Sequence, residues 1–362
     1  MNCSKLFLAL TIGSLFFVSC SNDDAPTPEV PLGTYDNGVL VLNQGGFGHG
    51  DATVSYISSN FLVQQNDIFS IVNPSITLGD TGQDIGLNNE FAYIVVNVSN
   101  KIQIVNRYTM QNITSITEGL KNPRYIAFAN GKGFVTNWGD GGNPNDDYVA
   151  VIDLSSNTVT SKIPVLEGPD RIIENDGKLY VAQTGGWGYG TKVTVIDAAT
   201  NKVTSTIAVG DVPDSMQIEN GNLWVACTGN PSYASAPAVQ SAGSLVKVSL
   251  ATNQVLTTYA YTDVTKHLSN LVISGSDAYF TVDSGIYKFA LSGTTLPEIQ
   301  LFSTLDQGVY GVYSFAINNN NIYVGDAGNY SNSGKVYVYS MTGTLNKTYS
   351  VGVVPAGFYF NE

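Results

Sequence analysis

The chain has 362 residues, of which only 12% are charged, and its net charge is −13. Nucleic-acid binding needs clustered Lys and Arg to displace counterions from phosphates, and binding to an anionic membrane surface needs a polybasic segment, so the composition argues against both. The 37 Gly and 21 Tyr favour β-structure with many turns. Two His and three Cys leave little material for a transition-metal site.

Residues 1–19 have the pattern of a signal peptide, because Lys5 is followed by an apolar run over residues 6–18 and a small Ser19. The run is too short for a transmembrane helix, which needs about 20 apolar residues. Since it ends at Cys20, it resembles a bacterial lipoprotein signal in which this Cys carries the lipid. The alternative is an ordinary signal peptide that happens to end near a Cys.

Residues 20–35 are predicted to form the lipidated Cys and a tether. Residues 21–24 resemble the acidic tag that sends lipoproteins of the Bacteroidota to the cell exterior, and the prolines that follow favour a stiff, extended spacer. We therefore expect a protein of the outer membrane that faces the cell exterior and touches the membrane only through its lipid anchor. Cys227, within an apolar run, is expected to be a buried structural thiol.

The rest of the chain, residues 36–362, repeats with a period of about 45 residues. Pro123, Pro169 and Pro213 each begin a strand that leads to an Asn-Gly or Asp-Gly turn. Such dipeptides supply the positive φ angles of two-residue hairpins. Three further strands follow each first strand, which is the pattern of a four-stranded propeller blade.

The remaining sequence completes a ring. Weaker copies of the template, which bring the number of blades to six, cover residues 83–117, 268–302 and 312–351. The chain ends supply a seventh, with second and third strands at 38–43 and 53–57 and the innermost strand at 358–360. This closure would remove exposed sheet edges. The sequence thus predicts an all-β, seven-bladed β-propeller, which we expect to be a monomer; a six- or eight-bladed ring and an open β-solenoid are the alternatives.

One face of this propeller is the predicted binding surface. The loops that join second to third strands, and those that join successive blades, emerge together on what we call the loop face; the short polar hairpin turns form the opposite, hairpin face. Loop-face glycines let the backbone approach a ligand, and flat rings offer contact area. The candidate ligand-binding residues in these loops are Phe47, His49, Trp138, Trp187, Tyr189, Tyr233 and Tyr330. The alternative is that the rings only pack on neighbouring loops.

Polar residues at the start of the innermost strands are predicted to surround the mouth of the central channel. These further candidates are Gln83, Asp84, Arg124, Asp170, Arg171 and Asp214. Asp170 with Arg171 could order a polar ligand, but the set could equally be a ring of structural ion pairs.

Signals for catalysis are weak. The sequence has no nucleophile elbow, zinc-binding His pair or P-loop. The loop from Asp140 to Asp147 offers oxygen ligands of the kind calcium prefers, but without the spacing of a known calcium loop, so a solvated loop is favoured. Paired carboxylates for glycoside hydrolysis stay open, because their separation is a matter of geometry. We predict no catalytic residue, no metal and no cofactor.

The repeated Val-Ile-Asp at 151–153 and 195–197, and Val-Gly-x-x-Pro at 209–213, resemble the YncE-like seven-bladed propellers. The opening at 41–48 and the ending at 355–361 resemble surface lipoproteins of the Bacteroidota, which include the surface cobalamin-binding propellers. The resemblance spans essentially the whole mature chain. It implies capture of a corrinoid and its transfer to a TonB-dependent transporter, and it implies no catalytic residue. Gln44 stands where that subgroup more commonly has an acidic residue.

Three functions follow as hypotheses. The first is non-enzymatic capture of a small-molecule ligand at the cell surface, with a corrinoid as the most specific candidate. The second is a protein- or glycan-binding module that uses the same face. The third is an enzyme, which would require a tight carboxylate pair or an occupied cofactor in the channel.

Overall fold

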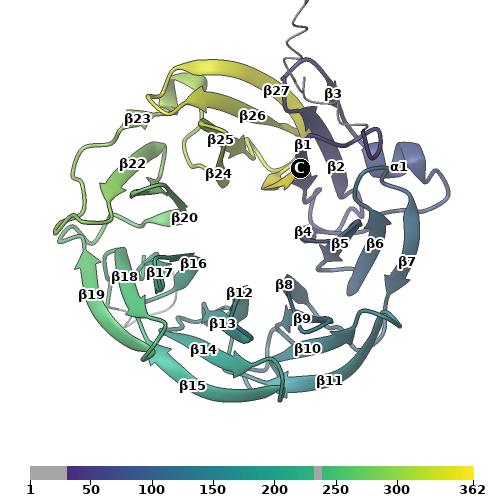
Figure 1. Ribbon diagram of the computed structural model, residues 1–362. Coiled ribbons are helices and arrows are strands. Elements are labelled where there is room, and N and C mark those ends of the chain that lie inside the picture. The colour runs from purple at the N-terminus through teal and green to yellow at the C-terminus, as the bar shows by residue number, and fades with distance from the viewer. Residues whose placement is uncertain (1–30, 232–238) are drawn as a thin grey trace, which may run out of the picture. The chain divides into compact units, whose positions relative to one another are not determined.

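The computed structural model describes residues 31–231 and 239–362, and Leu32–Glu362 forms one compact unit. In these residues the chain folds into seven four-stranded antiparallel sheets around a central axis (Figure 1). The predicted seven-bladed β-propeller is therefore confirmed. The predicted signal peptide, lipid attachment at Cys20 and the candidate Tyr233 lie outside the described residues.

Blades 2 to 7 follow one another in the chain, and each runs from the channel outward. Blades 2 and 3 contain β4 (Gly82–Asn88), β5 (Phe91–Val96), β6 (Lys101–Asn106), β7 (Asn112–Ile116), β8 (Pro123–Ala129), β9 (Lys132–Asn137), β10 (Tyr148–Asp153) and β11 (Thr158–Pro164). Blades 4 and 5 contain β12 (Pro169–Asn175), β13 (Lys178–Gln183), β14 (Lys192–Asp197), β15 (Lys202–Ala208), β16 (Pro213–Glu219), β17 (Asn222–Cys227), β18 (Ser244–Ser249) and β19 (Gln254–Ala260). Blades 6 and 7 contain β20 (Ser269–Ser274), β21 (Asp277–Val282), β22 (Gly285–Ala290), β23 (Phe302–Ser303), β24 (Ser314–Asn318), β25 (Asn321–Asp326), β26 (Ser333–Ser340) and β27 (Leu345–Val353).

Blade 1 is assembled from both ends of the chain. Its order is β28 (Pro355–Asn361), β1 (Gly38–Asn43), β2 (Thr53–Ser58) and β3 (Gln64–Gln65). Val39 pairs with Phe360 and Val41 with Phe358, so the predicted closing strand is present, and it begins three residues before and ends one residue after its predicted limits. A short helix, α1 (Ile68–Val72), follows β3, and a 3₁₀ turn, η1 (Leu305–Gln307), follows β23. In the described ranges no helix is long and apolar enough to cross a bilayer.

The hairpin turns have the geometry that their sequence predicts. Asn130 and Gly131, for example, have φ angles of 52° and 71°. Two consecutive positive φ angles match the right-handed twist of the strands they join, which is why Asn-Gly recurs here. These turns bring each second strand back alongside the first, in the middle of its blade, where β13 is buried along all but its first residue.

Apolar clusters lie between neighbouring blades rather than at one central point. Phe134 and Val151 of blade 3, for instance, pack against Leu179 and Val181 of blade 4. Among the described residues, all seven clusters are formed by residues from Tyr35 onward. Cys227 belongs to one of them, and burial raises the pKa of its thiol to about 12.

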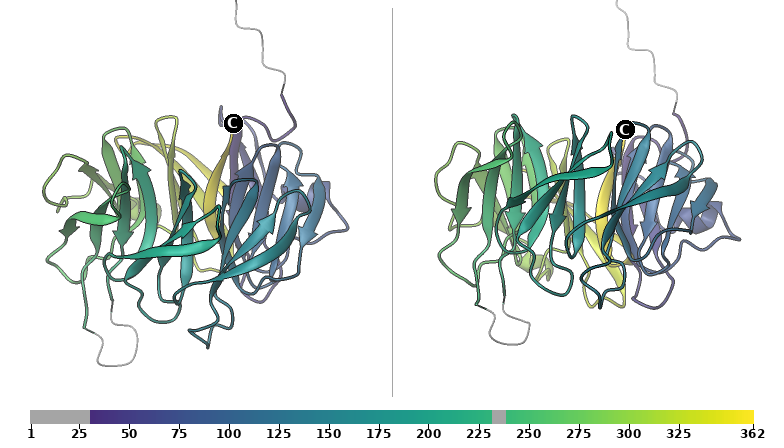
Figure 2. Two further views of the ribbon diagram at one scale, coloured as in Figure 1. Left: turned by 60° about the horizontal axis from the view of Figure 1, so that its bottom comes forward. Right: turned by 90° about the horizontal axis from the view of Figure 1, so that it is seen from below.

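The two faces of the ring differ as expected. Figure 2 shows long loops of blades 3 and 4 projecting on one side, with the C-terminus on the other. The folded unit also begins on the hairpin face, because the Asn361 amide donates to the carbonyl of Tyr35 at 2.6 Å. Both ends of the described unit therefore lie opposite the loop face.

Candidate functional site

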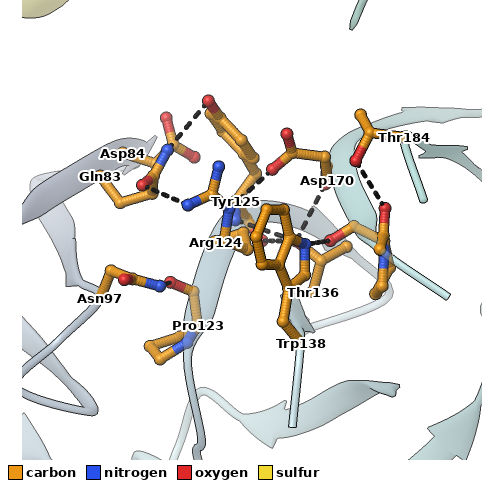
Figure 3. Close-up of polar contacts among 12 residues, drawn as sticks. Gln83, Asp84, Asn97, Pro123, Arg124, Tyr125, Thr136, Trp138, Asp170 and Thr184 are labelled. Atoms are coloured by element: carbon orange, nitrogen blue, oxygen red, sulfur yellow. Dashed lines mark hydrogen bonds and ion pairs between the residues drawn. The ribbon is translucent and has the colours of Figure 1, made fainter. Parts of the chain in front are cut away.

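Arg124 is the centre of a polar cluster at the loop-face end of the channel. Its Nε lies 2.9 Å from Oδ1 of Asp170 on the next blade, and its Nη1 donates to Oε1 of Gln83 on the preceding blade at 2.9 Å (Figure 3). The Arg124 and Asp170 side chains are only 19% and 15% exposed. A mostly buried charge is tolerated when it is paired and hydrogen-bonded, and here one guanidinium joins three innermost strands.

Two tryptophans extend this cluster outward to solvent. The Arg124 guanidinium lies 4.2 Å from the ring centre of Trp138, whose indole N–H donates to the carbonyl of Pro169 at 3.1 Å. Trp187 meets Trp138 edge-on, with 6.1 Å between ring centroids, and is 79% exposed. The arrangement is a stack that runs from a paired, mostly buried guanidinium to a ring that faces water.

Close backbone packing fixes the loop that carries Trp187. Gly168 has a φ of +66°, and a Cβ there would collide with the backbone of Gly186. The N–H of Gly168 donates to Oδ2 of buried Asp147 at 2.6 Å, which ties the blade 3–4 connection to the neighbouring loop. Burial raises the pKa of Asp147 to about 6.

The other predicted loop residues lie on the same face but in separate groups. Phe47, which is 82% exposed, and His49 are on the loop between β1 and β2. Tyr330, between β25 and β26, meets Tyr313 edge-on at 5.7 Å. Tyr189 is half-buried in the loop that carries Trp187. The structure thus joins Trp138 and Trp187 directly, whereas Phe47, His49 and Tyr330 lie at other blades.

The charged candidates are split between two depths of the channel. Asp170 pairs with Arg124 and not with its sequence neighbour Arg171. Arg171, one residue further along β12, lies with its guanidinium 4.2 Å from the Tyr125 ring centre, on the hairpin side of the Arg124 cluster. Burial raises the pKa values of Asp84 and Asp214, and the nearby charge of Arg171 opposes that shift in both.

Among the described residues, the loop face beside the two tryptophans is a platform rather than a pocket. The hollow between Trp138 and Trp187 has a volume of only about 10 Å³. Larger cavities lie elsewhere: one of about 540 Å³ on the hairpin face between blades 2 and 3, and one of about 480 Å³ in the channel. A ligand of the loop face would therefore be held by contact with rings and loop backbone.

The family described as "Domain of unknown function (DUF5074)" matches residues 37–360. The chain belongs to this family. The DUF5074 match begins just before β1 and ends within β28, so it covers the complete ring. No curated protein matches the chain in sequence.

Solved structures share the fold of this DUF5074 chain at low identity. A quinonprotein alcohol dehydrogenase-like protein from Bacteroides thetaiotaomicron has a TM-score of 0.65 and 15% identity, with 91% of this chain and 79% of that chain covered. A functionally unknown protein from Desulfotomaculum acetoxidans has a TM-score of 0.61 and 13% identity, with coverages of 90% and 98%. Hydrazine synthase from Kuenenia stuttgartiensis has a TM-score of 0.60 and 15% identity, with coverages of 76% and 88%. At these identities the likeness establishes the propeller fold alone.

The acidic loop from Asp140 to Asp147 uses its carboxylates internally. Asp146 accepts from the N–H of Asp140, and Asp140 accepts from the N–H of Gly142 at 3.3 Å and lies 3.5 Å from Lys121. Within the part of the chain that the structure describes, no group of three or more His, Cys, Asp or Glu is placed to hold a metal ion.

Three tyrosines of the channel were missed by sequence reasoning. Tyr125 accepts from the Gln83 amide at 3.0 Å, the Tyr359 hydroxyl donates to Oδ1 of Asp84 at 3.0 Å, and the Tyr313 hydroxyl donates to Gln44 at 2.8 Å. A signal for Tyr125 existed, because it follows Pro-Arg at the position where Arg171 follows Pro-Asp. Tyr359 lies between two core phenylalanines and carries no such signal.

Proposed function

We propose that this chain is a non-enzymatic capture protein of the outer membrane, held by lipid at Cys20, which binds its ligand on the loop face. The observation that carries the proposal is the stack of Arg124, Trp138 and Trp187. Burying an indole is favourable, yet the loops hold Trp187 79% exposed beside a shallow surface. Exposed rings on a rigid support are typical of a contact surface for a partner molecule.

A corrinoid is the most specific candidate ligand. The support is the resemblance of the chain's opening and ending to the surface cobalamin-binding propellers. A corrinoid is a large, flat macrocycle edged by amides, so it suits a broad platform with aromatic rings and loop backbone groups better than a small closed pocket. In this proposal binding is additive contact and hydrogen bonding, without a covalent step.

The position of the chain ends favours delivery from the cell surface. The folded unit begins beside Asn361 on the hairpin face, so both ends of the described unit lie opposite the loop face. Ligand held there would be accessible to a TonB-dependent transporter, to which we propose it is passed. A glycan or another protein is the second candidate occupant, since exposed tryptophans also bind sugars and protein surfaces.

Calorimetry with cyanocobalamin on the unit Leu32–Glu362 tests the corrinoid proposal. We expect a Kd in the micromolar range or tighter, and Trp187→Ala to weaken it at least about tenfold, equivalent to about 1.4 kcal/mol. The matched control is Leu256→Ala, which truncates an exposed apolar residue (55% exposed) near the hairpin-face start of β19 and should leave affinity unchanged.

Two results would redirect the proposal. Absence of micromolar binding removes the corrinoid. A glycan array or an outer-membrane pull-down that loses its signal in Trp187→Ala, but not in Leu256→Ala, would then assign the same face to a sugar or a protein.

A further inference from the structure

The channel contains a cavity that the loop-face site does not use. It has a volume of about 480 Å³, within the range of small-molecule sites, and innermost strands of the blades line it. Asp84, Tyr125 and Arg171 form its loop-side end, and Ala316 and Phe360 line it further toward the hairpin face. Gln83, Arg124, Asp170 and Trp138 are not among its lining residues, so the paired Arg124 cluster separates it from the loop face.

The walls of this cavity are rich in hydrogen-bonding groups. Each innermost strand pairs with a neighbour on one side only, so its other edge faces the channel. At the loop-side end these edges are tied together by side chains: Oδ2 of Asp84 accepts from the N–H of Ile126 at 3.0 Å, and Ser215 accepts from the N–H of Leu271 at 2.9 Å. Nearer the hairpin face, the cavity lies against strand edges and aliphatic side chains such as Val272 and Ala316.

Arg171 is the unusual group in this cavity. Its guanidinium contacts the Tyr125 ring, but it makes no hydrogen bond or ion pair with any residue in 31–231 or 239–362. A guanidinium carries five N–H donors in a rigid planar fork, and Arg171 is only half-buried. The donors of Arg171 therefore face the cavity without a protein acceptor.

The charges around Arg171 restrict which hydrogen-bond acceptors can bind to its N–H donors. Asp84 lines the same cavity, and Asp214 lies close enough for its charge to act on Arg171, although neither is within ion-pair distance. Two carboxylates beside one guanidinium do not make a positive site, so a free anion gains little there. A neutral oxygen acceptor can take the Arg171 donors without repulsion, and an N–H donor beside it can meet the Asp84 carboxylate.

We propose that this cavity is a second binding site, open toward the hairpin face, for a small uncharged molecule that carries a primary carboxamide. The carbonyl oxygen accepts from Arg171, the amide N–H₂ donates to Asp84, and the rest of the molecule lies along the strand edges between Val272, Ala316 and Phe360. This site is independent of the loop-face capture site and of the corrinoid.

Three probes of nearly the same shape test the assignment: benzamide, benzoate and benzylamine, measured by saturation-transfer NMR on the unit Leu32–Glu362. We expect benzamide to bind in the millimolar range or tighter and the two charged probes to bind at least about tenfold more weakly. Arg171→Met should weaken benzamide at least about tenfold. Ala316→Leu, which narrows the cavity without touching Arg171, should do the same and covers the case in which Arg171→Met does not fold.

The loop face supplies the control, since Trp187→Ala should leave benzamide binding unchanged, and Ala316→Leu should leave cyanocobalamin binding unchanged. Failure of the corrinoid proposal therefore does not affect this one. The assignment is overturned if benzamide does not bind, if benzoate binds as tightly as benzamide, or if benzamide binding survives Ala316→Leu.

Discussion

The two arginines of the channel lie on neighbouring innermost strands but differ in their hydrogen-bonding and ion-pair partners. Arg124 has a carboxylate, an amide oxygen and an indole ring as partners, and it joins blades 2, 3 and 4. Arg171, one position deeper on the next strand, has one ring and no hydrogen-bonded acceptor among the described residues. The Arg124 guanidinium is thus paired between blades, whereas the Arg171 guanidinium, one position deeper, lines the cavity without a hydrogen-bonded acceptor among the described residues. We therefore interpret Arg124 as structural and propose Arg171 as the binding group of the cavity.

Removing the closing strand should disrupt both the Arg124 cluster and the Arg171 cavity. It is the largest effect on stability that we expect. Deletion of residues 355–362 removes the partner of β1 together with Phe358 and Phe360, which pack on Tyr323 at 5.7 and 5.3 Å. Losing these two partly buried rings alone costs about 4 kcal/mol or more. We expect a melting temperature lower by at least about 10 °C, measured by circular dichroism.

A chain that ends at Asn361 is the control for this deletion. It keeps all of β28 and loses only the Glu362 contacts with Asn318, Asn319 and Arg107. It should melt within about 2 °C of the intact unit. Equal melting temperatures for the long and short deletions would show that the ring does not depend on closure.

Breaking the Arg124 pair should affect the loop-side end only. Asp170→Ala leaves a mostly buried guanidinium without its counter-charge, and we expect a loss of about 3 kcal/mol in urea unfolding. Replacing both partners, as Arg124→Met with Asp170→Leu, should recover most of this loss because no unpaired charge remains. Lys121→Ala removes the exposed ion pair between Lys121 and Asp140, whose charged atoms lie 3.5 Å apart, and should lower the free energy of unfolding by less than about 0.5 kcal/mol.

The Asp170→Ala variant also tests whether the Arg124 cluster and the Arg171 cavity are independent. Because Arg124 and Asp170 do not line the hairpin-side cavity, benzamide binding should persist in folded Asp170→Ala. Loss of benzamide binding in a variant that still folds would show that the two ends act as a single unit.

Most of the fold follows from local sequence signals. The Asn-Gly and Asp-Gly turns fix the hairpins because few other residues accept positive φ, and the 45-residue spacing of Pro123, Pro169 and Pro213 sets the blades. The closing strand was predictable because the first blade lacked an inner strand and the chain end supplied one.

The candidate site was less predictable, because its pairings cross from blade to blade. Asp170 and Arg171 are adjacent in sequence, but they lie at an irregularity of β12 between Pro169 and Ile172, and Asp170 pairs with Arg124 whereas Arg171 contacts the Tyr125 ring. The partner of Asp170 is Arg124, 46 positions away, and that pairing depends on how neighbouring strands are staggered. Periodicity therefore identified the channel residues without assigning them to its two depths.

Asp147 gives a pH-dependent test of the loop-side rim. Its pKa is raised by burial from 3.8 to about 6, so between these values the folded state holds a proton that the unfolded state has lost. Stability should therefore fall as the pH rises from about 4 to about 6 and stay at the lower level above that. Asp147→Asn removes this fall and can still accept from Gly168, so we expect a gain of about 1–2 kcal/mol at pH 7.5 and none at pH 4.

Asp153→Asn is the opposite-sign control for Asp147. The pKa of exposed Asp153 is lowered by hydrogen bonds from Ser155 and Ser156, so its stabilising contribution is present at neutral pH and is lost on acidification. Melting temperatures followed from pH 4 to pH 7.5 should diverge in opposite directions for the two variants. Parallel curves would mean that Asp147 is ionised normally in the folded state.

The smallest effect on stability is expected at the outer end of the tryptophan stack. Trp187 is 79% exposed, and its ring touches Trp138 only edge-on, so Trp187→Ala should lower stability by less than about 1 kcal/mol in urea unfolding. Trp138→Ala removes the ring over Arg124 and the bond to Pro169, and it should cost about 2–3 kcal/mol. If Trp187→Ala lowers the free energy of unfolding strongly, the ring stabilises the fold. If the variant keeps its stability but no longer binds the ligand, the ring belongs to the capture site.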